Sequence, residues 1–158
     1  MDKPGFWERR SLDELSDEEW ERLCDGCGRC CLHTFEDEDT GVVFASDVAC
    51  QLLDVRHCRC TDYANRLRRV SRCLDVRQLP RASYRWLPVT CAYRRLDEGL
   101  GLASWHPLVS GDPDSVHRAG ISVATFARAA TDAEGPAVDD VTLLEWHTDG
   151  SVNRVDEC

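Results

Sequence analysis

Apolar positions near the start of the chain recur at roughly helical spacing: Leu12, Leu15, Trp20 and Leu23. Two Ser-x-x-Glu patterns, which begin at Ser11 and Ser16, precede and overlap this stripe and are typical of helix N-termini. The pattern therefore predicts a helix over residues 16–23 that delivers Cys24 at its C-terminal end. Residues 1–10 are expected to form an N-terminal arm whose Phe6 and Trp7 pack against the domain.

Further along, the pattern changes to short apolar runs separated by turn residues. A second helix is expected after Pro88, over residues 90–97, with Gly99 ending it. Residues 110–120 are rich in Gly, Asp, Pro and Ser and predict a loop with one helical turn. Short strands are expected over residues 42–45, 121–127 and 141–146.

Together these elements predict an α+β fold of short helices and a few short strands, organised around metal–thiolate sites. At 158 residues the chain fits one small, irregular domain, and it shows no internal repeat or linker. We expect this domain to span residues 1–158, with an acidic turn at residues 36–39 and a frayed tail over 149–158.

Composition limits what such a fold can bury. Leu, Ile, Val and Phe make up 35 of the 158 residues, about 22 %, which is little apolar material for a core. The chain also contains ten cysteines. A structural zinc site contributes roughly 10–16 kcal/mol of apparent binding free energy, most of it expressed as folding. Bound metal would therefore add materially to the stability of this chain.

Charge is segregated along the chain, whose formal net charge is −10. Residues 1–40 carry thirteen acids against five bases, and residues 56–95 carry eleven arginines against two acids. A basic segment of this kind is compatible with nucleic-acid binding, but the net acidity opposes it and no RNA-binding motif or helix-turn-helix pattern accompanies it. We favour arginines that neutralise the chain's own acids and a thiolate-bound metal.

Four thiols within eight residues, from Cys24 to Cys31, are the strongest chemical signal. Thiolates at C-x2-C spacing converge on one soft cation. The spacing of Cys24, Cys27 and Cys30 also matches the three ligands of a cubane iron–sulfur cluster. Because adjacent side chains diverge, we expect Cys30 and Cys31 to serve different metal positions.

Cysteines recur downstream of this motif, and His57 lies beside one of them. In an extended segment Cys58 and Cys60 would share a face and approach one metal position. His57 is either a further ligand or a solvent-facing, hydrogen-bonded side chain. Cys158, at the end of the chain, is expected to be a bystander. The predicted metal ligands are Cys24, Cys27, Cys30, Cys31, Cys50, Cys58, Cys60, Cys73 and Cys91.

The chain shows no signal-peptide pattern and no apolar run long enough for a membrane span. We therefore expect a cytoplasmic protein, whose thiols stay reduced and bind metal rather than form disulfides. The expected partner is a metal ion, with no membrane and no nucleic acid.

With its cysteines laid out, the chain resembles the YcgN-like cysteine-cluster family of bacteria, within the CxxCxxCC group of zinc- or iron-chelating domains. The resemblance covers residues 6–123. It is carried by these motifs: FW at Phe6, LCDGCGRCC from Leu23, DEDT from Asp37, VAC from Val48, CRC-x-x-Y from Cys58, Cys73, WLPVTCAYR from Trp86, WHPL from Trp105 and ISV from Ile121. It implies metal chelation and no particular reaction. The wider group's pattern maps onto seven of the nine cysteines, whereas Cys58 and Cys91 are particular to the subgroup.

The sequence thus indicates a cysteine-rich protein that chelates zinc or iron. The alternative is an iron–sulfur protein that acts as an electron carrier, redox sensor or enzyme component. A thiol oxidoreductase and a nucleic-acid-binding module are weaker alternatives.

No Ser–His–Asp arrangement, phosphate loop or glycine-rich fingerprint predicts a catalytic residue. Two closed four-thiolate sites would use eight of the nine cysteines, which leaves one free or bridging; one cluster plus a mononuclear site is the other possibility.

Overall fold

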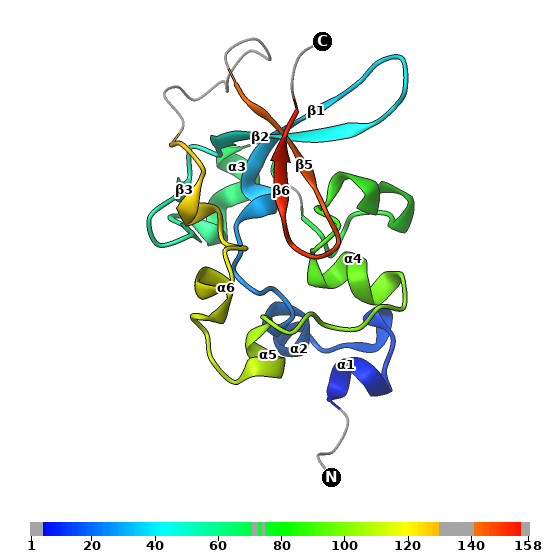
Figure 1. Cartoon of the computed structure of the whole chain (residues 1–158). Helices are drawn as coiled ribbons and strands as arrows, with labels where there is room; N and C mark the ends of the chain where they lie inside the picture. The colour runs from blue at the N-terminus through cyan, green and yellow to red at the C-terminus, as the bar shows by residue number, and fades with distance from the viewer. Residues whose placement is uncertain (1–4, 71–72, 74, 130–140, 156–158) are drawn as a thin grey trace.

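The computed structural model describes residues 5–70, 73, 75–129 and 141–155, which form a mixed α+β fold of short helices and short antiparallel strands (Figure 1). The helices are α1 (Phe6–Arg9), α2 (Asp17–Arg22), α3 (Arg66–Arg69), α4 (Ala92–Asp97), α5 (Pro107–Ser110) and α6 (Ser115–Arg118). The strands are β1 (Leu32–Glu36), β2 (Val43–Ala49), β3 (Leu53–Asp54), β4 (Arg59–Cys60), β5 (Leu143–Trp146) and β6 (Val152–Arg154). Five 3₁₀ turns join them, at Leu12–Glu14, Arg29–Cys31, Tyr63–Asn65, Arg81–Trp86 and Val123–Thr125.

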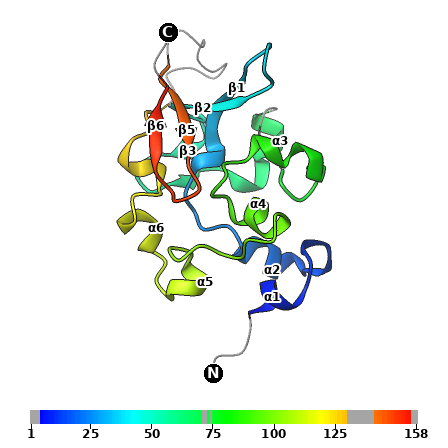
Figure 2. The same cartoon turned by 45° about the vertical axis from the view of Figure 1, so that its right-hand side comes forward.

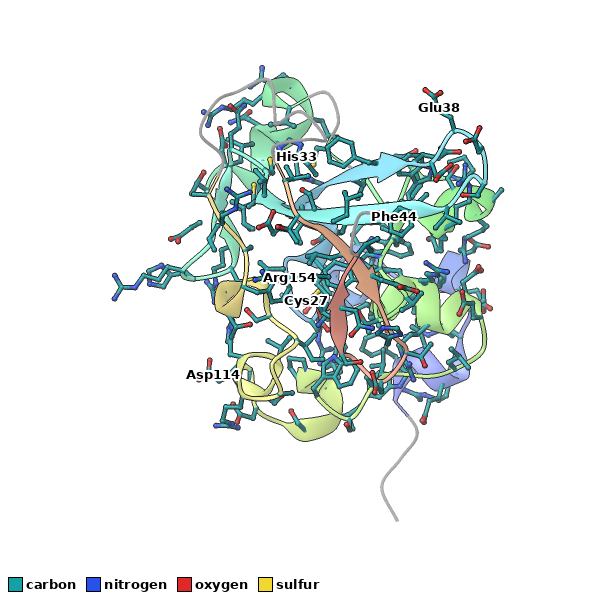
Figure 3. The ribbon with its side chains drawn as sticks, turned by 45° about the horizontal axis from the view of Figure 1, so that its top comes forward. Cys27, His33, Glu38, Phe44, Asp114 and Arg154 are labelled. Atoms are coloured by element: carbon teal, nitrogen blue, oxygen red, sulfur yellow. The ribbon has the colours of Figure 1, made fainter. Side chains whose placement is uncertain are left out.

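Four strands form an antiparallel sheet in the order β1-β2-β5-β6, and β3 and β4 form a separate two-stranded ribbon. The sheet lies at the end of the molecule near the described C-terminus, and α1, α2 and α5 lie at the opposite end (Figures 1 and 2). Glu38 marks the outer tip of the β1–β2 hairpin (Figure 3). The acidic segment 36–39 is thus the solvent-facing turn that the sequence predicted.

The first predicted helix is present as α2, and its cap explains where it begins. Ser16 Oγ accepts a hydrogen bond from Glu19 N–H at 3.2 Å, while the Glu19 carboxylate accepts one from Ser16 N–H at 3.0 Å. This reciprocal pair satisfies two backbone donors that a helix start otherwise leaves free. The helix ends at Arg22, so that fully buried Leu23 delivers Cys24 as expected. The second predicted helix is α4, which begins two residues later than expected and is followed by Gly99 in the left-handed region.

Three clusters of buried apolar residues fill the interior, and the smallest consists of Cys27, Val116 and Ile121. The helical core consists of Phe6, Leu12, Leu15, Trp20, Leu23, Tyr84, Leu87 and Tyr93. The sheet core consists of Leu32, Ala45, Ala49, Leu53, Cys58, Val123 and Leu144. In the helical core Trp20 stacks on Tyr93 with ring centroids 4.6 Å apart, and the Tyr93 hydroxyl donates to the Trp20 carbonyl at 2.6 Å. Because Phe6 belongs to the helical core, the N-terminal arm packs on the domain, as predicted.

The predicted strand over residues 121–127 is wrong. Ser122 Oγ accepts a hydrogen bond from Ala124 N–H at 3.1 Å and so starts the 3₁₀ turn Val123–Thr125. Val123 N–H donates to the Cys27 carbonyl at 2.9 Å instead of to a neighbouring strand. The apolar run is buried because it packs beside the cysteine motif, which the sequence pattern alone does not distinguish from a sheet strand.

The end of the chain also differs from the expected frayed tail. Residues 152–154 form β6, which pairs with β5, and Gly150 supplies the tight turn between them at φ +96°. Strand β1 was not predicted, and β2 extends the predicted strand 42–45 as far as Ala49. Cys158 lies outside the described residues.

Arginines of the basic segment reach the acidic N-terminal part of the chain. Arg77 pairs with Asp17 at 3.3 Å, Arg81 with Asp13 at 2.8 Å, and Arg85 with Glu36 at 3.4 Å. Such partly exposed pairs contribute little stability individually. They do connect segments far apart in sequence, which is the charge neutralisation that the sequence indicated. Among the residues that the structure describes, no helix has the length and apolar character needed to cross a membrane.

Candidate metal centre

The cysteine motif is a turn that leaves the end of α2 and enters β1. Gly26 and Gly28 have φ values of +77° and +74°, which L-residues with a side chain rarely adopt. Just before Gly26, the buried carboxylate of Asp25 accepts hydrogen bonds from Cys27 N–H at 3.0 Å and from the Trp105 indole N–H at 3.2 Å. The turn is thereby fixed by a carboxylate whose two donors come from different parts of the chain.

A first thiol group contains three cysteines of this motif and Cys91, which precedes α4. Cys30 and Cys91 both pack against the helical core. Cys24 is exposed as a residue, but its thiol points into the protein far enough for desolvation to raise its pKa. The nearby Cys30 and Cys91 raise that pKa further. Desolvation likewise raises the pKa of Cys91 to about 12, with Cys30 as the next cause.

Cys27 completes this first group. Desolvation raises the pKa of its buried thiol, and Asp25, Cys30 and Cys24 add to the shift. Its sulfur accepts a weak hydrogen bond from Arg29 N–H at 3.5 Å. In Figure 3 Cys27 lies inside the molecule, behind the β5–β6 hairpin. The cubane-spaced cysteines Cys24, Cys27 and Cys30 thus interact electrostatically with one another, and Cys24 and Cys30 also interact with Cys91.

A second thiol group is assembled by backbone pairing. Cys50 N–H donates to the Cys31 carbonyl at 2.7 Å, and Leu53, one turn after Cys50, pairs with Cys60 across the β3–β4 ribbon. Desolvation raises the pKa of Cys73, as do Cys50, Cys30 and Cys60, whereas Arg66 lowers it. Cys31, Cys50, Cys60 and Cys73 therefore lie near one another and near Cys30, whose pKa is raised first by a side-chain hydrogen bond with Cys31.

The expected shared face of Cys58 and Cys60 is wrong. Cys58 has a left-handed backbone with φ +58°, and its side chain is buried in the sheet core, whereas Cys60 lies in β4. Desolvation raises the pKa of Cys58, and the nearby polar groups of Ser122 and Val123 oppose that shift. The left-handed turn breaks the extended geometry on which the expectation depended.

His57 is solvent-facing and hydrogen-bonded, which is one of the two states expected for it. Its Nδ1 lies 2.8 Å from the Asp54 carboxylate, and its side chain is 69 % exposed. The Asp54 pKa is lowered by this interaction, first through the side-chain hydrogen bond from His57. The geometry thus gives His57 a partner other than a metal.

Arg29 is the functional residue that the sequence reasoning missed. Although charged, it is only 1 % exposed. Its guanidinium donates to the Ile121 carbonyl and the Gly150 carbonyl, each at 2.7 Å, and lies 4.5 Å from the centroid of the Trp146 ring. A long arginine placed inside a dense cysteine motif is the only sequence signal that could have drawn attention to it.

The acceptors of the Arg29 guanidinium are neutral, so its counter-charge must come from neighbours at longer range. Desolvation lowers the Arg29 pKa, and the nearby acidic groups Cys27 and Asp25 raise it. A buried cation is costly unless an anion compensates it. Thiolates bound to a metal would supply that anion beside Cys27.

The donor set fits zinc or iron. All nine cysteines of the described residues carry free thiols, and soft thiolate ligands select zinc, copper(I) and iron–sulfur clusters. Within the described ranges, no three His, Cys, Asp or Glu side chains already stand in a metal-holding arrangement. Binding therefore requires the neighbouring thiols to turn toward a common ion and lose their protons.

Fold and site together define a small α+β cysteine-cluster protein. Residues 23–92 match the CxxCxxCC family model, described as "Putative zinc- or iron-chelating domain". A UPF0260 protein of Rhizorhabdus wittichii is 60 % identical over 148 residues, 92 % of this chain and 94 % of the relative. UPF0260 proteins of Gluconacetobacter diazotrophicus (59 % over 122 residues, 77 % and 76 %) and Cellvibrio japonicus (56 % over 143 residues, 89 % and 95 %) are also similar.

The chain belongs to the UPF0260 family, which confirms the YcgN-like resemblance carried by its motifs. No solved structure matches it.

The first prediction concerns the two glycines of the motif. A Cβ on Gly28 would lie 2.5 Å from Cys58 Sγ and 2.8 Å from Val123 Cγ2, whereas a Cβ on Gly26 would meet nothing within 4 Å. Both substitutions strain a positive φ, but only Gly28→Ala also overpacks the sheet core, which costs about 1–3 kcal/mol more. Urea unfolding of the two variants should reveal this difference; equal loss of stability would contradict the packing described.

The second prediction concerns Arg29. Arg29→Met should lower the free energy of unfolding by about 3 kcal/mol or more, because buried carbonyls lose a charged donor. Exposed Arg154→Met is the matched control and should change it little. Urea unfolding at equal metal content makes the comparison. A near-neutral Arg29→Met would show that the guanidinium does not hold these segments together.

Proposed function

We propose that this protein chelates zinc or iron in the cytoplasm through the thiolates of its CxxCxxCC motif and downstream cysteines. The candidate ligands are the nine cysteines between Cys24 and Cys91. The observation that carries the proposal is the convergence of free thiols, most of them partly or fully buried, from separate segments of the chain, with the buried cation Arg29 near Cys27. Apolar packing alone gives no reason for this convergence of thiols with a guanidinium.

Electrostatics supports the same function. A divalent ion bound by four thiolates carries a formal charge of −2, which protein cations must offset inside a poorly solvated site. Arg29 lies beside Cys27, and Arg66 lies near Cys73. Asp25 near Arg29 and Asp75, 4.0 Å from Arg66, already supply one negative charge each, and metal-bound thiolates would add to it.

An iron–sulfur cluster is the second candidate function, and one observation favours it. Cys91 interacts electrostatically with Cys24 and Cys30 of the cubane-spaced set and would be the fourth thiolate that a [4Fe–4S] cluster requires. Such a cluster would make the protein an electron carrier, a redox sensor or an enzyme component. Zinc, which has no redox chemistry, would make the same site structural.

Anaerobic purification followed by elemental and sulfide analysis tests these alternatives. Colourless protein with stoichiometric zinc would exclude the iron–sulfur cluster. Brown protein with acid-labile sulfide would overturn simple chelation. Protein that contains neither metal nor sulfide, and that takes up neither in reconstitution, would refute the proposed function. Aerobic preparations do not decide the matter, because zinc stands above ferrous iron in the affinity order and can replace it.

The third prediction couples metal to folding. Removing the metal with a strong chelator under reducing conditions should abolish most of the ordered structure, because the apolar core is lean. Circular dichroism and the melting temperature, recorded before and after metal loss has been verified, provide the measurement. Unchanged spectra and melting would contradict the coupling.

The fourth prediction distinguishes a motif cysteine from the terminal one. Cys27→Ser should sharply lower metal content and soluble yield, because Cys27 is buried inside the motif. Cys158→Ser, at the chain end, should change neither and serves as the control. Metal content by elemental analysis decides, and an equal loss in both variants would refute the assignment.

A further inference from the structure

We infer that Trp105 and His106 are positioning residues of the candidate metal centre, which fix the chain on both sides of Cys24 without binding metal themselves. The two residues begin the WHPL segment, which supplies no thiol and lies outside the range 23–92 that matches the chelating-domain model. This inference rests on the proposed function, and it adds two residues that prepare a candidate ligand for the metal.

His106 fixes the backbone just before Cys24. Only 1 % of the residue is exposed, and its Nε2 lies 2.7 Å from the Leu23 carbonyl oxygen. A carbonyl oxygen can only accept a hydrogen bond, so Nε2 carries the proton. The other ring nitrogen, Nδ1, accepts a hydrogen bond from Leu108 N–H at 3.0 Å. Both ring nitrogens are therefore occupied, which leaves His106 no lone pair for a metal ion.

Trp105 fixes the chain just after Cys24. Its indole N–H donates to one carboxylate oxygen of Asp25 at 3.2 Å, and the other oxygen accepts a hydrogen bond from Cys27 N–H at 3.0 Å. Trp105 is held in turn by Ser115, whose hydroxyl donates to the Trp105 carbonyl at 2.6 Å, and its ring packs against the small cluster that contains Cys27. One indole thus connects to two residues of the cysteine motif.

These two contacts restrict a part of the chain that has no regular structure of its own. Helix α2 ends at Arg22, and Gly26 with its positive φ follows soon after. Between them, Leu23 and Asp25 are anchored to residues 83 and 80 positions further along the chain. A Cys24 that is already in place loses less conformational entropy when it binds an ion, so the metal is bound more tightly.

Two substitutions separate the two hydrogen bonds of the imidazole. In His106→Asn the side-chain oxygen can replace Nδ1 as the acceptor for Leu108 N–H, but the shorter side chain cannot reach the Leu23 carbonyl. In His106→Gln the longer amide can still donate to that carbonyl. The zinc affinity of the reduced, full-length protein, measured by competition with a chromophoric chelator, should fall about 10–100-fold in His106→Asn. His106→Gln should retain most of the affinity.

Ser46→Ala is the matched control for lost stability. It removes a buried hydroxyl whose hydrogen bonds with Val48 lie within β2. Its zinc affinity should therefore fall much less than that of His106→Asn. Trp105→Phe, which lacks the indole N–H, should lower the affinity in the same direction as His106→Asn and does not depend on the soluble yield of that variant.

A double-mutant cycle tests whether His106 acts through Cys24. If it does, Cys24→Ser/His106→Asn should bind zinc no more weakly than Cys24→Ser alone, because the residue that His106 positions is already lost. A purely structural role would instead give additive losses.

Additive losses, equal losses in His106→Asn and His106→Gln, or losses in His106→Asn and Trp105→Phe no larger than in Ser46→Ala would each overturn the positioning role and leave chelation intact. A Cys24→Ser variant with wild-type zinc affinity would overturn it as well. A wild-type protein that binds no zinc would instead refute the proposed function itself.

Discussion

The buried guanidinium of Arg29 is the interaction on which the rest of the structure depends. It joins the cysteine motif to segments 61, 92 and 121 residues away, through Thr90, Ile121 and Gly150. Helices and strands as short as these have little stability of their own. A charged residue at the centre, with acceptors from several loops, fixes their relative positions. It also creates a need for negative charge that thiolate-bound metal would meet.

On the proposed function, metal binding and folding would be two aspects of one process in this chain. The apolar residues divide into a helical core, a sheet core and a smaller cluster that contains Cys27, each of modest size. Metal bound by the thiols of the motif would tie these clusters together. With metal-bound thiolates in place of apolar contacts as the central link, a sequence with only about 22 % Leu, Ile, Val and Phe would still specify one fold.

Local signals in the sequence predicted the elements that local interactions determine. The Ser16 capping box fixed α2, and the position of Cys24 after it followed. Features that depend on distant partners were not predictable in this way. The segment 121–127 turns because Val123 bonds to Cys27, and β6 forms because β5 is available to pair with it. The same limit applies within the site, where Cys58 leaves the extended geometry and Arg29 finds its partners only in three dimensions.

X-ray absorption spectroscopy at the metal edge of anaerobically purified protein tests the central claim most directly, because it reports the atoms that touch the metal. The account predicts a first shell of four sulfur atoms, at about 2.3 Å if the metal is zinc, without nitrogen or oxygen. A shell dominated by nitrogen or oxygen at about 2.0–2.2 Å would show that the metal is held elsewhere and would contradict the account.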